Sequence, residues 1–131
     1  MQKDVVLAPV SALKPADLAG EAFTLASLRV QMKEISLPEA RRPTIQFGEA
    51  GRVSGLAGVN RYSGTGELSA AGDLTWKGDM VLTRMAGPPE AMALEASFLA
   101  GLREINKAVL ERGILRLTSA DGGTKMEFRR P

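Results

Sequence analysis

The feature that most restricts how this chain can fold is a run of closely spaced glycines near its middle. The segment 53–66 holds Gly55, Gly58, Gly64 and Gly66. Glycine allows positive φ and lets two backbones approach closely, so we expect this segment to turn sharply and not to continue as one regular element. We predict antiparallel strands on either side of it and one helical turn at 59–62.

Short stretches in which apolar and polar residues alternate predict strands elsewhere in the chain. The alternation is clearest at 114–118, and an Asp-Gly-Gly turn at 121–123 connects that stretch to the next one. A loop bracketed by two prolines is expected at 37–43. The predicted strands are 21–30 with a bend near its middle, 44–47, 52–55, two short strands around a turn at 70–73, 80–85, 108–111, 114–118 and 125–129, with one further short strand at 5–7.

One long helix is predicted from Pro88 to about Asn106. Proline is favoured at the start of a helix, and an early Glu90 suits the positive end of the helix dipole. The helical period gathers one apolar face, made of Ala91, Leu94, Phe98, Leu102 and Ile105.

These elements predict an α+β fold, in which a curved antiparallel sheet or cracked barrel of about eight short strands packs on one long helix. A chain of 131 residues has the length of a single domain. We assign residues 18–131 to that domain. Residues 1–17, with two prolines and several alanines, are expected to form a loosely ordered lead-in.

The chain contains no histidine and no cysteine, which removes the usual groups for several kinds of chemistry. A serine hydrolase triad lacks its base, and a zinc site lacks its preferred ligands. A serine–lysine dyad remains open in principle, but no motif supports it. We therefore expect a protein that is not an enzyme, with no catalytic residues, no metal and no cofactor.

Charge and hydropathy argue against two classes of interaction, with nucleic acid and across a membrane. Seventeen basic and fifteen acidic residues are interspersed and give a net charge of +2, without the basic stripe that is typical of nucleic-acid binding. No apolar run approaches the length of a transmembrane helix. The first residues do not form a signal peptide, which leaves open a removed leader or a lipid anchor on a preceding cysteine.

The most suggestive polar cluster is Asn60, Arg61 and Tyr62, directly after the glycines. One interpretation is a ligand or partner site at the mouth of the sheet, to which Thr83 and Arg84 contribute as a second pair. The other interpretation is structural: Asn60 caps a helical turn through its side-chain oxygen, Arg61 is solvated and Tyr62 packs in a half-buried position. We favour the structural interpretation.

Glu95 lies on the core side of the predicted helix, between Leu99 and Leu102 on the helical wheel. A buried carboxylate without a partner would be costly in free energy. Arg84, on the strand that precedes the helix, is the nearest candidate in the sequence. We therefore predict an Arg84–Glu95 ion pair that fixes the helix to the sheet.

Several of these segments, in this order, resemble the META domain family, which includes the HslJ-like heat-inducible lipoproteins of bacteria. The central match is the run RVSGLAGVNRYSG at 52–64, and the resemblance extends over about residues 18–131. The family commonly has a cysteine directly before the Asn-Arg pair and another after Thr-Arg-Met-Ala, where this chain has Val59 and Gly87. The other matching segments are 18–20, 23–25, 43–48, 82–86, 95–102, 114–117 and 128–130.

The resemblance implies a small bacterial envelope module, periplasmic or anchored to the outer membrane, which we expect to be monomeric and related to stress. We expect it to act through contacts with an unknown envelope protein or peptide. An alternative is a carrier that binds an acyl chain or small hydrophobic ligand inside the cracked barrel. A further alternative is inhibition of an envelope hydrolase by the glycine-rich loop.

Overall fold

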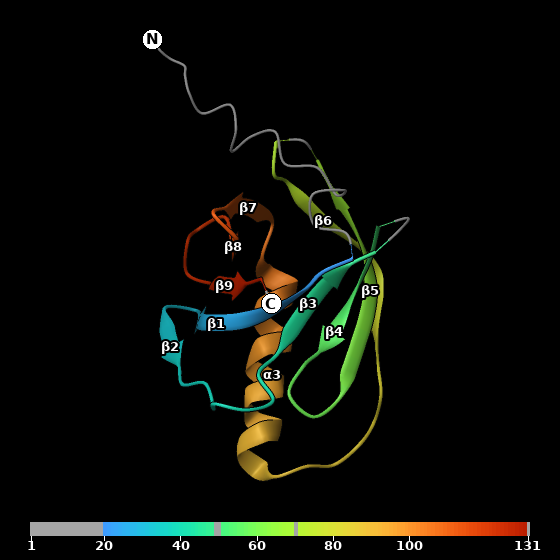
Figure 1. Ribbon diagram of the computed structural model, residues 1–131, viewed down its shortest axis with the longest axis vertical. Coiled ribbons are helices and arrows are strands. Elements are labelled where there is room, and N and C mark those ends of the chain that lie inside the picture. The colour runs from blue at the N-terminus through green and yellow to red at the C-terminus, as the bar shows by residue number, and fades with distance from the viewer. Residues whose placement is uncertain (1–19, 49–50, 70, 131) are drawn as a thin grey trace.

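The computed structural model describes residues 20–48, 51–69 and 71–130, which form one curled sheet and one helix (Figure 1). The lead-in predicted at 1–17 and the strand predicted at 5–7 lie outside these residues. The elements are β1 (Ala22–Val30), β2 (Lys33–Ile35), β3 (Thr44–Phe47), β4 (Arg52–Leu56), β5 (Arg61–Leu68), β6 (Leu74–Leu82), α3 (Pro89–Glu104), β7 (Lys107–Glu111), β8 (Ile114–Thr118) and β9 (Lys125–Arg129).

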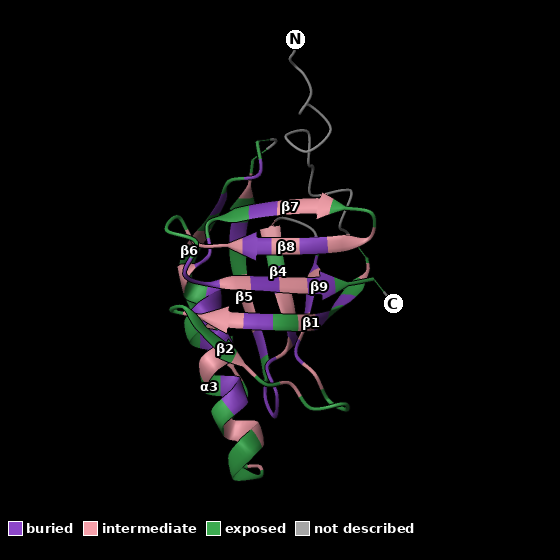
Figure 2. Cartoon of the chain, turned by 90° about the vertical axis from the view of Figure 1, so that its left-hand side faces the viewer, coloured by how far each residue is buried: buried purple, intermediate pink, exposed green. Residues whose placement is uncertain are grey.

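The strands form one antiparallel sheet with the order β6-β5-β4-β3-β1-β9-β8-β7, and β2 pairs with β1 beside this path. Figure 2 shows β1, β9, β8 and β7 crossing in front of β4 and β5, so the sheet curls until its two halves face each other. The two outermost strands meet at one end, where a bridge joins Asp73 to Lys107. The predicted curved sheet with one long helix is therefore confirmed.

The local predictions around the glycines are only partly correct. The expected bend in β1 is present as a register shift between Leu25 and Ser27. The helical turn predicted at 59–62 is wrong, because Arg61 and Tyr62 already belong to β5. Of the strand expected at 80–85, only 80–82 are strand, as the end of a longer β6. The pairing of β6 with β5 shifts register between Lys77 and Val81, a stretch that includes Gly78 (φ +69°).

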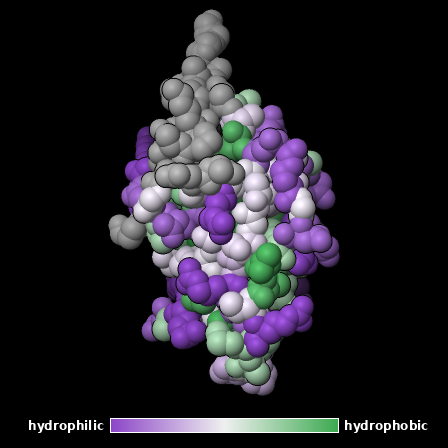
Figure 3. All heavy atoms as spheres, turned by 90° about the vertical axis from the view of Figure 1, so that its right-hand side faces the viewer, coloured by the Kyte–Doolittle hydropathy of each residue, from purple (hydrophilic) through white to green (hydrophobic). Residues whose placement is uncertain are grey.

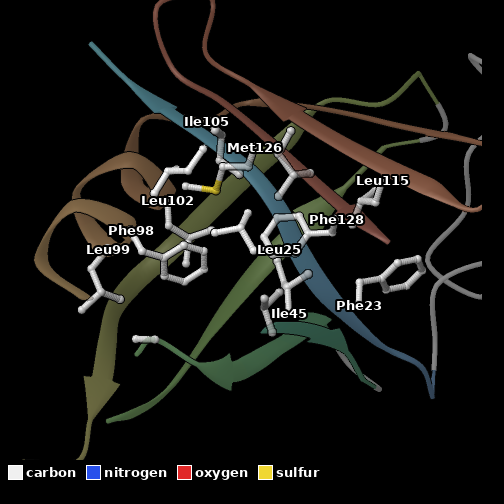
Figure 4. Close-up of a cluster of buried hydrophobic side chains, with 14 of the residues drawn as sticks. Phe23, Leu25, Ile45, Phe98, Leu99, Leu102, Ile105, Leu115, Met126 and Phe128 are labelled. Atoms are coloured by element: carbon white, nitrogen blue, oxygen red, sulfur yellow. The ribbon is translucent and has the colours of Figure 1, made fainter. Parts of the chain in front are cut away.

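The apolar face of α3 packs into the concave side of the sheet. Leu94, Phe98 and Leu102 are buried as the helical wheel predicts. The Phe98 ring meets the Phe128 ring edge-on at 6.2 Å and the Tyr62 ring at 5.7 Å. Figure 4 shows side chains from the helix and from β1, β3, β8 and β9 converging in one cluster, which fills the space between helix and sheet.

One glycine of the central run is required by a close approach of two backbones. A Cβ atom on Gly55 would lie 2.2 Å from the carbonyl oxygen of Thr44 on the neighbouring strand β3. That carbonyl oxygen also accepts a hydrogen bond from the Tyr62 hydroxyl at 2.7 Å. A side chain at position 55 would therefore displace both the strand and the tyrosine that is bonded to it.

We predict that Gly55→Ala lowers the free energy of unfolding by about 1–3 kcal/mol, because the backbone must shift to remove the overlap. Gly48→Ala is the matched control, since a Cβ there would meet only ordinary contacts at 3.7 Å. Urea denaturation of both variants measures the difference. Equal stabilities of the two variants would contradict the close approach of β3 and β4.

Candidate functional site

A buried carboxylate joins the helix to the glycine-rich turn. Glu95 extends inward from α3, and 7% of its surface is exposed. Its Oε1 accepts hydrogen bonds from the backbone amides of Val59 (3.0 Å) and Asn60 (2.6 Å). Its Oε2 accepts a third from the Asn60 side-chain amide at 2.9 Å. The carboxylate therefore holds the turn between β4 and β5 in place.

The Asn60 side chain extends this network to the segment that leads from β6 to the helix. Its Oδ1 accepts hydrogen bonds from the Met85 amide (2.6 Å) and the Thr83 hydroxyl (2.9 Å), and its Nδ2 also donates to the Met85 carbonyl oxygen (3.1 Å). The Thr83 hydroxyl in turn accepts a hydrogen bond from the Arg61 amide. Asn60 thus connects two loops and the helix, and it does not cap a helical turn.

The hydrogen bonds control the charge state of Glu95. Burial by itself would raise the pKa of this carboxyl group. The side-chain and backbone amides of Asn60 and the amide of Val59 act in the opposite direction, and their net effect is a pKa below the usual value. Glu95 is therefore an anion at neutral pH, with its charge distributed over three donors from a single turn.

The predicted ion pair between Arg84 and Glu95 is not the arrangement found. Among residues 20–48, 51–69 and 71–130, no ion pair joins the two, and the Arg84 side chain is exposed. Neutral amide donors replace the cation, because the turn reaches Glu95 with three N–H groups at once. This satisfies the carboxylate without burying a second charge.

The remaining predicted site residues separate into buried and exposed ones. Tyr62 is only 2% exposed, more deeply buried than expected, and burial raises the pKa of its hydroxyl group. Arg61 is exposed, as the structural interpretation expected. The structure therefore brings together Asn60, Thr83 and Glu95, while Arg61 and Arg84 extend away from this network.

A groove of about 830 Å³ opens on the surface beside the network. Its buried lining residues are Gly58, Val59 and Leu94. Arg41 comes from the loop between β2 and β3, and Glu90 comes from the first turn of α3. The loop between β6 and α3 also lines the groove. At the lowest end of the face in Figure 3, neutral and weakly hydrophobic residues lie between hydrophilic residues on both sides. We call this hollow the Val59 groove.

Comparison with known proteins identifies the family. The model of the META domain matches residues 16–131. This chain belongs to the META domain family. A comparison with curated proteins gives no significant match.

Three solved structures resemble this META domain. One, described as the NMR structure of a protein from Burkholderia xenovorans, is 22% identical with a TM-score of 0.71, over 100% of this chain and 95% of that one. A second NMR structure is 31% identical with a TM-score of 0.65, over 89% and 94%. A DUF4847 family protein from Bacteroides vulgatus is 12% identical with a TM-score of 0.59, over 86% and 93%, and shows similarity of fold alone.

The two positions at which the META pattern commonly has cysteines lie in contact in this structure. A Cβ atom on Gly87 would lie 2.6 Å from Val59 Cγ2 and 3.4 Å from Val59 Cβ. The valine side chain thus occupies the space into which a side chain at position 87 would extend. Packing of a valine against a bare backbone takes the place of a covalent link between the two loops.

Sequence reasoning missed two parts of this site. It assigned Glu95 a charged partner, whereas two of the three donors are backbone amides, which leave no pattern in side-chain identity. It also missed the Val59 groove, whose walls come from loops far apart in the chain. One signal was available: Val59 and Gly87 replace a cysteine pair, which implies that the two loops touch.

We predict that Glu95→Gln lowers the free energy of unfolding at pH 7 by about 1–3 kcal/mol, because the glutamine NH2 group would face N–H donors of the turn. Wild-type stability from this carboxylate is complete above the ordinary glutamate pKa of about 4.3 and is lost as the pH falls through the lower pKa of the folded state. Urea denaturation over a pH series should show the difference between the two proteins shrinking upon acidification. Glu90→Gln, an exposed position on the same helix, is the control, and a difference of the same size there would contradict the prediction.

We predict that the double variant Val59→Cys/Gly87→Cys forms a disulfide upon oxidation. The Cβ separation of 3.4 Å is close to the 3.5–4.5 Å of natural disulfides. The chain-entropy model gives a gain of about 3–4 kcal/mol in unfolding free energy over the reduced form. Thermal denaturation with and without reductant measures it, with Val59→Cys alone as control. Two free thiols after oxidation would show that the loops are not in contact.

Proposed function

We propose that this META domain is a non-enzymatic binding module that acts through contacts with a protein or peptide in the Val59 groove. The observation that supports it is the groove itself, whose volume of about 830 Å³ lies within the range of ligand pockets. Its buried lining residues are apolar, and the only charged residues among those that line it are Arg41 and Glu90, which are both exposed. A partner that excludes water from this apolar surface lowers the free energy of the complex.

The alternative proposal is a carrier for an acyl chain or small hydrophobic molecule. The apolar lining of the groove also suits this ligand. A ligand between helix and sheet is not favoured, because the buried cluster of side chains fills that region. Native mass spectrometry of the protein isolated from its own cells distinguishes the two, since a co-purified lipid supports the carrier and its absence counts against it.

We also propose that the module works in the bacterial envelope, in a stress-related role. Resemblance to the heat-inducible lipoproteins of the META family supports this proposal. No helix among the described residues is long and apolar enough to span a membrane. Fractionation of cells that express the complete gene product tests the location directly.

We predict that dodecapeptides selected from a phage-displayed library on the wild-type domain bind Ala91→Glu at least about tenfold more weakly. Ala91 lines the groove in the first turn of α3, where a glutamate suits the helix dipole and so should not unfold the protein. Ala93→Glu, exposed and outside the groove, is the matched control. Failure to select any peptide, or equal binding by all three proteins, would exclude the groove as a peptide site.

A further inference from the structure

Backbone groups along the Val59 groove lack hydrogen-bond partners. In the described part of the chain, the backbone amides and carbonyls of Ala86 and Gly87 form no hydrogen bond, although the neighbouring Met85 is bonded through both to Asn60. On the opposite wall, the backbone of Leu37 forms none either. These polar groups border an apolar floor.

This combination favours a peptide over an acyl chain as occupant. An acyl chain in the groove would cover the free amides and carbonyls without bonding to them, and each buried polar group left without a partner costs free energy. An extended peptide carries its own amides and carbonyls in alternation. These groups can form hydrogen bonds with the backbone at the edge of the groove, while the peptide side chains reach the apolar floor.

Gly87 leaves its backbone bare at this edge. The space beside it is filled from below by Val59, so a side chain could not be accommodated there. The glycine is therefore required by its contact with Val59 inside the fold. The edge is also fixed before any ligand arrives, because Asn60 holds Met85 from both sides and Thr83 pairs with Arg61. Binding there would require little ordering of the protein.

The charges at the groove suggest what flanks such a peptide. Arg41 comes from the loop between β2 and β3, and Glu90 from the first turn of α3, so the two walls carry opposite charges. Within the loop of Arg41, Arg42 Nε donates a hydrogen bond to the Pro38 carbonyl oxygen at 2.5 Å. A complementary peptide has an acidic residue toward Arg41 and a basic residue toward Glu90.

We propose that the occupant of the Val59 groove is an extended peptide segment that adds to the edge formed by Ala86 and Gly87 through backbone hydrogen bonds. Its apolar side chains bury against Val59 and Leu94, and its flanking charges are opposite to those of the two walls. This inference rests on the proposed function and specifies its ligand class and binding mode.

The test uses one synthetic dodecapeptide, selected on the intact chain and counter-selected against Ala91→Glu, in versions that are N-methylated at one position each. Alternate amides of an extended segment point toward the pairing edge. Because the edge consists of two residues, methylation should lower the affinity about tenfold at the one or two amides that bond to it and have little effect at the neighbouring positions. Fluorescence anisotropy measures each dissociation constant.

The outcomes separate the inference from the function on which it rests. Arg41→Glu should weaken binding of the selected peptide, and a peptide with the complementary charge reversal should restore it. An affinity that is insensitive to N-methylation at all positions, together with displacement of the peptide by dodecanoate, would overturn strand addition and leave an apolar groove. If no peptide survives counter-selection, the proposed function fails as well.

Discussion

The arrangement of this domain depends on one buried carboxylate and the turn that surrounds it. Glu95 would destabilise the core if it were unsatisfied, and it is stabilised by amides from a single turn between β4 and β5. The same turn carries Asn60, which fixes Met85 in the segment before the helix. Helix, turn and connecting segment therefore have one common point of attachment.

The Val59 groove is a consequence of this attachment. The turn held by Glu95 supplies Gly58 and Val59 to its floor, and the segment held by Asn60 supplies Met85 and Gly87 to its wall. A contact between Val59 and Gly87 draws the two together by packing, at positions where the META pattern commonly has cysteines. The apolar hollow is thus bordered by segments that hydrogen bonds and packing hold together.

Much of the fold could be predicted from the sequence, since the helix and most strands show clear periodicity. The errors lie in and near the glycine-rich stretches: Gly78 hides the continuity of β6, and Arg61 and Tyr62 begin β5 where a helical turn was expected. For the site, the sequence predicted the polar cluster around Asn60 and the inward direction of the Glu95 side chain. It did not predict their direct contact, because the bonded donors include backbone amides.

The sequence by itself determined that Glu95 points to the core and that the glycine-rich segment turns sharply, because both follow from local geometry. Only the tertiary structure decided that these two features meet, and that neutral amides of Val59 and Asn60 satisfy the carboxylate in place of Arg84. The physical reason is distance along the chain. Thirty-five positions separate Asn60 from Glu95, so the packing of the helix against the curled sheet determines which donors reach the buried charge.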